Sequence, residues 1–405
     1  MAAPEAEVRA AARQFNIGKH SIFQKLKTQY LSRTLETQHL SRIKNAAPFK
    51  NQLTGSAVMK VKNNMFHGVI AAMLTGLLAT SAFAQTNYKF DKVATVKLGG
   101  PAGHGDLLSF DAANHRLFIA MHDHGVSVVD TKTNKLVKYI SNVPSPNGSA
   151  IDGHYFFVTA AEGPGAGKVN AILIFDANTL KEVGRVNTKG TSPDWLAINP
   201  KTHILYVASD DNNWDEMYDV SNPTKPVYKG AINLYPAKPV SGPDVGTIVP
   251  AKNTIYQADD AYVLKINATT GQIEDHFDTR VKLGKHGGTK ASYFDQKNNR
   301  LWFATTNHPN PGVLVLTPDS GLIKTLPESG GVDDAQADPG LGLLYLFSSS
   351  SKGFDVYDLN AMTHLTHVST GYGFTHTGMV DPATHLVYAF GGAGPDLVVY
   401  KPVKE

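Results

Sequence analysis

The fold is decided by the stretch FDAANHRLFIAMHDHGVSVVDTKTNKLV at residues 110–137. It contains an anchor at Asp111, an aromatic residue seven positions later at Phe118, and a second polar turn that begins at Asp130. Apolar and β-branched runs lie between these turns, a pattern typical of short antiparallel strands. The same arrangement returns in NPKTHILYVAS at residues 199–209 and in DPATHLVYAF at residues 381–390.

Seven copies of this unit follow one another at intervals of 41 to 50 residues. A repeat of about 40 to 50 residues with four short strands is typical of a β-propeller blade. Six copies place an aromatic residue seven positions after the anchor, and Phe157 takes that place in the second copy, whose turn is shorter. The anchors are Asp111, Asp152, Asn199, Val249, Asp295, Asp338 and Asp381.

The two ends of the repeated region complement each other. The seventh copy has three strand-like runs and then ends at Glu405, so it lacks a fourth strand. Before the first copy, Lys92–Leu98 reads KVATVKL, which is strand-like but has no local partner. Pairing this segment with the last blade would close the circle and remove an open edge. The sequence therefore predicts an all-β fold, a seven-bladed β-propeller of four-stranded blades whose last blade is closed by an N-terminal strand.

The quoted stretches resemble the YVTN/YncE-like family of seven-bladed β-propellers over roughly residues 88–405. The tetrad that names the family is approximated by YVAS at Tyr206–Ser209 and by FVTA at Phe157–Ala160. The resemblance implies the propeller architecture and an exported protein, and it implies no particular activity.

Residues 59–84 have the three parts of a secretory signal peptide: Lys60 and Lys62, an apolar run, and Ala-Phe-Ala before Gln85. An uncleaved membrane anchor is the alternative. We expect residues 1–58 to be a non-structural or mis-annotated extension, the alternative being a basic tail, and residues 85–405 to be the propeller. The predicted location is periplasmic or secreted, without membrane insertion after cleavage.

Charge and composition narrow the partners. Residues 1–84 carry 11 Lys and Arg against 3 Asp and Glu, which leaves 27 basic against 32 acidic residues in the rest. This mildly acidic body argues against a nucleic-acid-binding protein. The chain has no cysteine, which excludes disulfides, thiolate metal sites and cysteine nucleophiles.

The residue five positions before each anchor is polar in all seven copies. These entry residues begin the innermost strands, so we expect them to surround the mouth of the central channel. A water-filled channel accounts for their polarity, and a site for a cation or polar ligand is the functional interpretation. They are Asp106, Asn147, Asp194, Asp244, Lys290, Asp333 and His376.

Six histidines fall in loops that should face the same mouth. Neutral imidazole is a common ligand of transition metals, so they are candidate ligands of a divalent metal ion. His–Asp pairs are also candidates for general acid–base chemistry. Turn histidines such as His203 and His385 are interpreted as structural, and His364 and His367 as solvated. The six candidate ligands are His104, His122, His124, His286, His308 and His376.

One further candidate is Trp214, in an acidic segment (SDDNNWDEMYD, residues 209–219) that we expect to overhang the mouth as a lid or partner contact. The chain has no G-x-S-x-G, P-loop or H-E-x-x-H motif. Two functions therefore stay open. The first is a binding protein or scaffold that recognises a small molecule, a metal ion or a protein. The second is a metal-dependent lyase, lactonase or other hydrolase.

Overall fold

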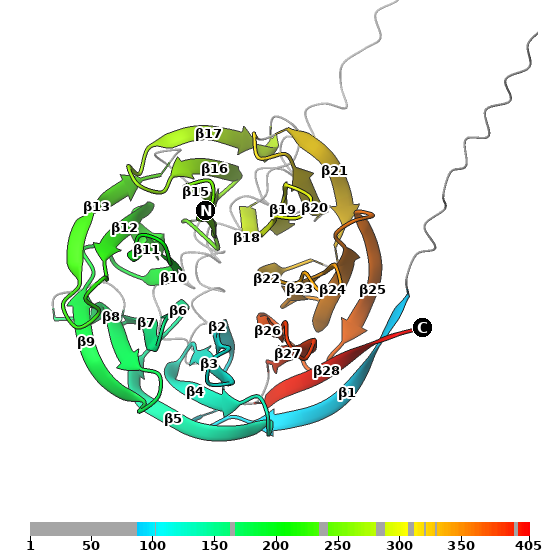
Figure 1. The fold of residues 1–405 in the computed structure, drawn as a ribbon, viewed down its shortest axis with the longest axis horizontal. Coiled ribbons are helices and arrows are strands. Elements are labelled where there is room, and N and C mark those ends of the chain that lie inside the picture. Colours follow the sequence, from blue (N-terminus) through cyan, green and yellow to red (C-terminus); the bar gives the residue numbers. More distant parts are fainter. Residues whose placement is uncertain are drawn as a thin grey trace, which may run out of the picture. The chain divides into compact units, whose positions relative to one another are not determined.

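The computed structural model describes residues 87–101, 103–162, 167–234, 242–280, 288–306, 312–319, 321–328, 330–392 and 396–405. These residues form seven four-stranded antiparallel sheets set around a common axis (Figure 1). The predicted seven-bladed β-propeller is therefore confirmed. The predicted extension at 1–58 and the predicted signal peptide at 59–84 lie outside the described residues.

Six of the seven blades run from an innermost to an outermost strand in chain order. The first three blades comprise β2 (Gly105–Asp111), β3 (Arg116–Met121), β4 (His124–Asp130) and β5 (Lys135–Pro144); β6 (Ser149–Asp152), β7 (Tyr155–Ala161), β8 (Asn170–Asp176) and β9 (Lys181–Asn187); and β10 (Pro193–Asn199), β11 (Ile204–Ser209), β12 (Trp214–Asp219) and β13 (Val227–Asn233). A short 3-10 helix, η1 (Asp210–Asn212), joins β11 to β12.

The next three blades repeat the arrangement. They comprise β14 (Thr247–Val249), β15 (Thr254–Asp259), β16 (Tyr262–Asn267) and β17 (Ile273–Asp278); β18 (Gly288–Asp295), β19 (Arg300–Thr306), β20 (Gly312–Leu316) and β21 (Leu322–Pro327); and β22 (Val332–Asp338), β23 (Leu343–Ser348), β24 (Gly353–Asp358) and β25 (Thr363–Ser369).

The seventh blade is built from both ends of the propeller. It comprises β26 (Gly378–Asp381), β27 (Leu386–Gly391), β28 (Asp396–Lys404) and, outermost, β1 (Tyr88–Lys97). β1 pairs with β28 from Tyr88 opposite Lys404 to Lys97 opposite Asp396, and Lys97 Nζ lies 2.6 Å from Asp396 Oδ2. The predicted closing strand is confirmed, and Figure 1 shows β1 and β28 side by side on the rim.

The aromatic residue on the second strand of each blade, usually seven positions after the anchor, packs neighbouring blades together. Each pairs with the residue two positions before its anchor, as Phe118 does with Ser109, and Phe157 occupies the same register in blade 2, opposite Ala150. Phe118 packs against Phe156 of blade 2, and Trp302 packs with Leu344 of blade 6. Burying an aromatic side chain removes about 150–250 Å² from water, so these contacts form much of the core.

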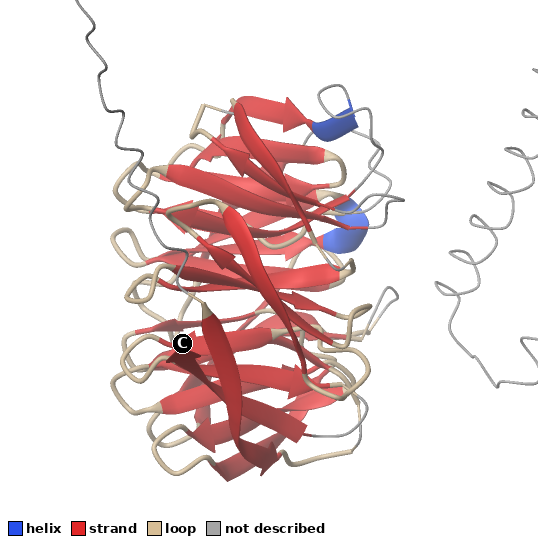
Figure 2. Ribbon diagram, turned by 90° about the vertical axis from the view of Figure 1, so that its right-hand side faces the viewer, coloured by secondary structure: helices blue, strands red, loops and turns tan. Residues whose placement is uncertain are grey.

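Polar turn residues end the strands as predicted. The Asp130 side chain accepts a hydrogen bond from the Thr133 backbone N–H at 2.7 Å, and Asp176 accepts one from Thr179 at 2.7 Å. Such local bonds satisfy the backbone where the chain reverses. Each innermost strand runs from its entry residue, near the channel mouth, to its anchor, on the opposite face. Figure 2 shows strands throughout, with helical turns on one face only. Among the described residues, no helix has the length and hydropathy needed to span a membrane.

Candidate ligand-binding site at the channel mouth

The entry residues lie where the ladders of the innermost strands become irregular. Pairing shifts register between Gly105 and Leu108 in blade 1, between Pro193 and Leu196 in blade 3, and between Val332 and Asp334 in blade 6. A β-bulge redirects the side chain that it contains. The bulges therefore aim Asp106, Asp194 and Asp333 out of the sheet ladder at the mouth of the channel.

Three entry residues from blades 1, 6 and 7 form a charged group. His376 Nδ1 lies 3.1 Å from Asp333 Oδ2, and His376 Nε2 lies 3.9 Å from Asp106 Oδ1. The first contact is an ion pair without the alignment of a hydrogen bond. Burial alone would lower the pKa of His376, but the carboxylates of Asp333 and Asp106 overcome it and hold that pKa at about 9. At neutral pH this imidazole is therefore cationic.

The carboxylates of this group respond differently to their surroundings. Burial raises the pKa of Asp106 to about 6, although the charge of His376 opposes the shift. Burial would also raise the pKa of Asp333. The close contact with His376 and the positive charges of His376 and Lys290 instead keep that pKa below its ordinary value. Asp333 is thus the main counter-ion of His376, and Asp106 retains a proton more readily.

Lys290 and Asp244 make a second ion pair across blades 4 and 5. The Asp244 carboxylate raises the pKa of Lys290 above its ordinary value, which keeps the ammonium charged despite its burial. The charge of Lys290 also acts to lower the pKa of Asp333 and that of Asp194, so it offsets part of the negative charge of the ring.

Asp194 is the entry residue that stands apart. The residue is half-buried, and among the described residues it has neither a hydrogen-bond nor an ion-pair partner. Burial raises its pKa well above the ordinary value, and the nearby carboxylates of Asp106 and Asp244 raise it further. A group that holds its proton this strongly for lack of a partner gains most from the arrival of a cation.

Aromatic rings line the side of the mouth formed by blades 7 and 1. The rings of His104 and His122 lie 4.1 Å apart, and that of His104 lies 6.0 Å from His376. Phe374 stacks on His376 at 4.9 Å and meets His104 edge-on at 5.1 Å. Burial and the charge of His376 lower the pKa of His104, so it is a neutral imidazole at physiological pH.

Phe374 was missed by the sequence analysis. It is 39% exposed, and its φ of 64° lies in the left-handed region that bulky residues rarely adopt. Strained residues of this kind concentrate at ligand-binding positions. The sequence carried a weak indication, because Phe374 stands two residues before His376 in a glycine-rich entry loop.

The predicted metal ligands are only partly brought together. His104, His122 and His376 share one wall of the mouth, whereas His286 and His308 lie outside the described residues. His124 begins β4, and its side chain is likewise outside the description. Within the described part of the chain, no three His, Asp or Glu side chains are grouped so as to hold a metal ion.

The two remaining candidates contribute less. Trp214 is the first residue of β12 and half-buried, so the segment expected to overhang as a loop is η1 followed by a strand. Asn147 contributes its backbone, since its carbonyl accepts a hydrogen bond from the Leu107 N–H at 3.1 Å. Its side-chain Oδ1 is buried and has no partner among the described residues.

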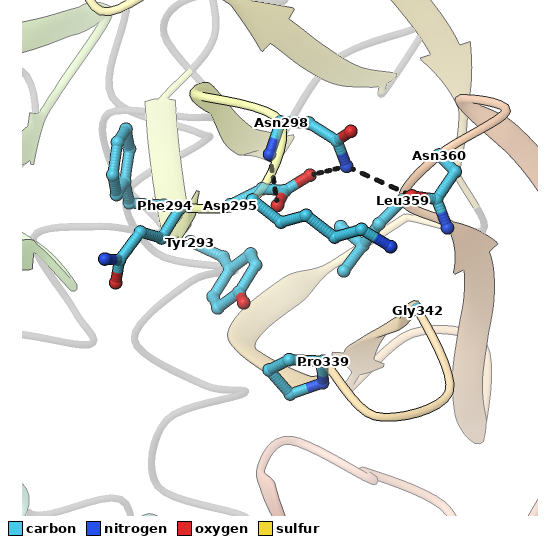
Figure 3. A pocket seen from close by; sticks show the side chains of 10 residues that line it. Tyr293, Phe294, Asp295, Asn298, Pro339, Gly342, Leu359 and Asn360 are labelled. Atoms are coloured by element: carbon cyan, nitrogen blue, oxygen red, sulfur yellow. Dashed lines mark hydrogen bonds between the residues drawn. The ribbon is translucent and has the colours of Figure 1, made fainter.

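A pocket of about 510 Å³ lies at the anchor end, between blades 5 and 6 (Figure 3). Asn298 binds both oxygens of Asp295, at 3.1 and 2.7 Å, and donates to Asn360 at 3.3 Å. Arg300 donates to the Leu359 carbonyl at 3.2 Å.

Blade 1 repeats this arrangement. Asn114 binds Asp111 there, and Arg116 donates to the carbonyls of Ala177 and Asn178 in blade 2. The polar groups around the pocket thus form a set of hydrogen bonds between blades that recurs in the ring. We therefore assign the pocket a structural role.

The turn histidines also act between blades. His203 Nδ1 lies 2.7 Å from the anchor Asp152, and His385 Nδ1 lies 2.6 Å from the anchor Asp338 of the preceding blade. Their structural interpretation is confirmed.

No protein-family model matches the chain, and no curated protein has a significantly similar sequence. The charged and aromatic residues at the channel mouth are therefore the features that bear on function.

Proposed function

We propose that this chain is an exported binding protein whose channel mouth takes a small ligand with a cationic group and a flat apolar part. The observation that carries the proposal is Asp194, whose residue is half-buried and whose carboxylate has no partner among the described residues. A bound ammonium or guanidinium group would supply the missing counter-charge through charge-assisted hydrogen bonds.

The balance of charge at the mouth supports a cationic ligand. Four carboxylates meet two cations there, and the cations are already engaged, Lys290 with Asp244 and His376 with Asp333. The carboxylates of Asp106 and Asp194 are left in excess, and the charge of Asp106 contributes to the raised pKa of Asp194. The positive charge of a ligand near Asp106 and Asp194 relieves this repulsion, and the same carboxylates repel anions.

The aromatic wall supports the apolar part of the ligand. Phe374 is exposed, and its ring is held by His376 and His104 on two sides. An aromatic face kept in a strained backbone conformation offers a rigid surface for stacking, at little cost in ordering on binding. Binding sites commonly combine such surfaces with a few fixed polar groups.

Export and family membership belong to the same proposal. The tripartite segment at 59–84 supports secretion to the periplasm or beyond, and the repeat supports a place near the YVTN/YncE-like propellers. N-terminal sequencing of the protein recovered from the periplasmic fraction tests the first part. We expect it to begin at Gln85, and recovery with residues 59–84 attached would contradict cleavage.

The binding proposal is tested by calorimetric titration of the purified protein with amines and their isosteric anions. We expect butylamine, benzylamine and agmatine to bind, benzylamine to bind more tightly than butylamine because of Phe374, and butyrate and benzoate not to bind. Asp194→Asn should weaken amine binding about tenfold or more, which corresponds to ~1.4 kcal/mol.

The matched control is Asp319→Asn, which removes the same charge from a side chain that is 87% exposed. It should leave amine affinity unchanged. Equal affinities in wild type and Asp194→Asn, or stronger binding of the anions, would overturn the proposed function.

A further inference from the structure

Two carboxylates are fully buried between blades 3 and 4, away from the channel. Asp215, the second residue of β12, and Asp259, the last residue of β15, are each 0% exposed. All four of their carboxylate oxygens lack a hydrogen-bond partner among the described residues. Gln257 is also 0% exposed, and its Oε1 has no partner there either.

Strand geometry turns these three side chains toward one another. Asp215 stands directly opposite Ala208, and such cross-strand partners share one face of a sheet. Ala208 packs in one cluster with Ile255 of blade 4, so Asp215 faces blade 4. Side chains alternate along β15, and Gln257 and Asp259 therefore share the face of Ile255, which looks toward blade 3.

The charges are close enough to influence each other. Burial raises the pKa of Asp215 to about 7. Burial likewise raises the pKa of Asp259 to about 8, and the charge of Asp215 is the next cause, followed by that of Asp260. Two ionised carboxylates placed together in the interior without donors are strongly unfavourable unless a cation joins them.

Two other buried carboxylates have hydrogen-bond donors. Glu216, adjacent to Asp215 and also 0% exposed, accepts hydrogen bonds from the backbone of Lys189 at 2.9 Å and from Ser209 Oγ at 3.3 Å. Asp334 accepts from Thr377 Oγ1 at 3.1 Å and from the Gly378 N–H at 3.2 Å. Asp215, Asp259 and Gln257 instead bring five oxygens without hydrogen-bond partners among the described residues to one interface, which favours a ligand there.

We propose that Asp215, Asp259 and Gln257 hold a hard divalent cation, of the Ca²⁺ type, that fastens blade 3 to blade 4. Ca²⁺ takes six to eight oxygen ligands, accepts bidentate carboxylates and amide carbonyls, and tolerates irregular geometry. Its charge balances the two carboxylates. The site lies behind the channel mouth, because the Gln257 amide donates to the backbone carbonyl of Asp244. The proposed cation site is independent of the proposed function.

The test measures the thermal transition of the full-length protein after EDTA treatment and dialysis, then during Ca²⁺ titration at constant ionic strength set with NaCl. We expect Ca²⁺ at a hundred times its dissociation constant to raise the midpoint by about 4 °C. Elemental analysis after desalting should find about one cation per chain, which follows from a single closed site.

Asp215→Asn and Asp259→Asn should each lose both the shift and the bound cation, whereas the exposed control Asp319→Asn should keep them. The direct cation measurement on wild type keeps the proposal testable if a variant fails to fold. Two results would overturn it: a wild-type midpoint unchanged by EDTA and Ca²⁺, or variants that still respond to Ca²⁺. A wild type that does not respond to Ca²⁺, together with Asn variants that are more stable than it, would indicate that the two carboxylates share a proton instead.

Discussion

Replacing His376 by Gln removes the cation that joins blades 6, 7 and 1 at the channel mouth. The folded pKa of about 9 lies above the ordinary 6.5, a difference that corresponds to about 3 kcal/mol. The side chain is 18% exposed, so channel water screens part of this, and we expect about 2 to 3 kcal/mol.

The pH at which this contribution acts follows from the direction of the shift. Because the folded pKa is raised, the stabilisation is fully present below about pH 6.5 and is lost as pH rises through about 9. Asp106, with its pKa raised to about 6, acts at lower pH and in both proteins. Its pKa is lowered by the charge of His376 in wild type only, so Asp106 adds its own pH dependence to the difference at the acid end of the range.

The assay is denaturant unfolding of wild type and His376→Gln from about pH 6 to about pH 10. The difference in free energy of unfolding should shrink by about 2 to 3 kcal/mol across that range. His154→Gln, an exposed histidine at the anchor end, should give a difference that does not change with pH. A flat difference for His376→Gln as well would refute the assigned charge state.

Three further changes probe the ring. Trp302→Ala should cost about 3–5 kcal/mol in denaturant unfolding, because Trp302 is 1% exposed and packs blade 5 on blade 6; a cost below about 1 kcal/mol would contradict that packing. Asp334→Ala should cost about 3 kcal/mol, since it leaves the Thr377 and Gly378 donors of blade 7 unpaired, and Asp334→Asn should recover part of the loss. Phe90→Ala should lower the thermal midpoint by loosening β1 from Tyr345 at 6.1 Å, and an unchanged midpoint would argue against closure by β1.

The architecture was predictable because its determinants are local. Anchor, turn and aromatic recur within a dozen residues, and the register opposite each aromatic is the same in all seven blades. The closing strand was predictable by elimination, because a strand-like run at one end matched a missing strand at the other. The repeat also located all seven entry residues at or just before the starts of the innermost strands, and four of these strands are bulged there.

The chemistry of the site was less accessible from sequence, because it depends on contacts between blades. Which carboxylate pairs with Lys290 depends on how blades 4 and 5 pack, because its partner Asp244 lies 46 residues earlier in another sheet. His364 and His367 were predicted to be solvated, and this was wrong: both reach the buried Asp355, at 3.2 and 3.0 Å. Phe374 and the pair of Asp215 and Asp259 lie outside the repeated positions, so the periodicity could not single them out.

Proton release on ligand binding tests the central claim, a mouth whose spare carboxylates await a cation. The measurement is calorimetric titration of the best-binding amine at about pH 6, in two buffers of different ionisation enthalpy. The raised pKa of Asp194, together with that of Asp106 at about 6, predicts net proton release when the amine arrives. Asp194→Asn should release fewer protons. Binding without proton release, or equal release from wild type and Asp194→Asn, would contradict the account.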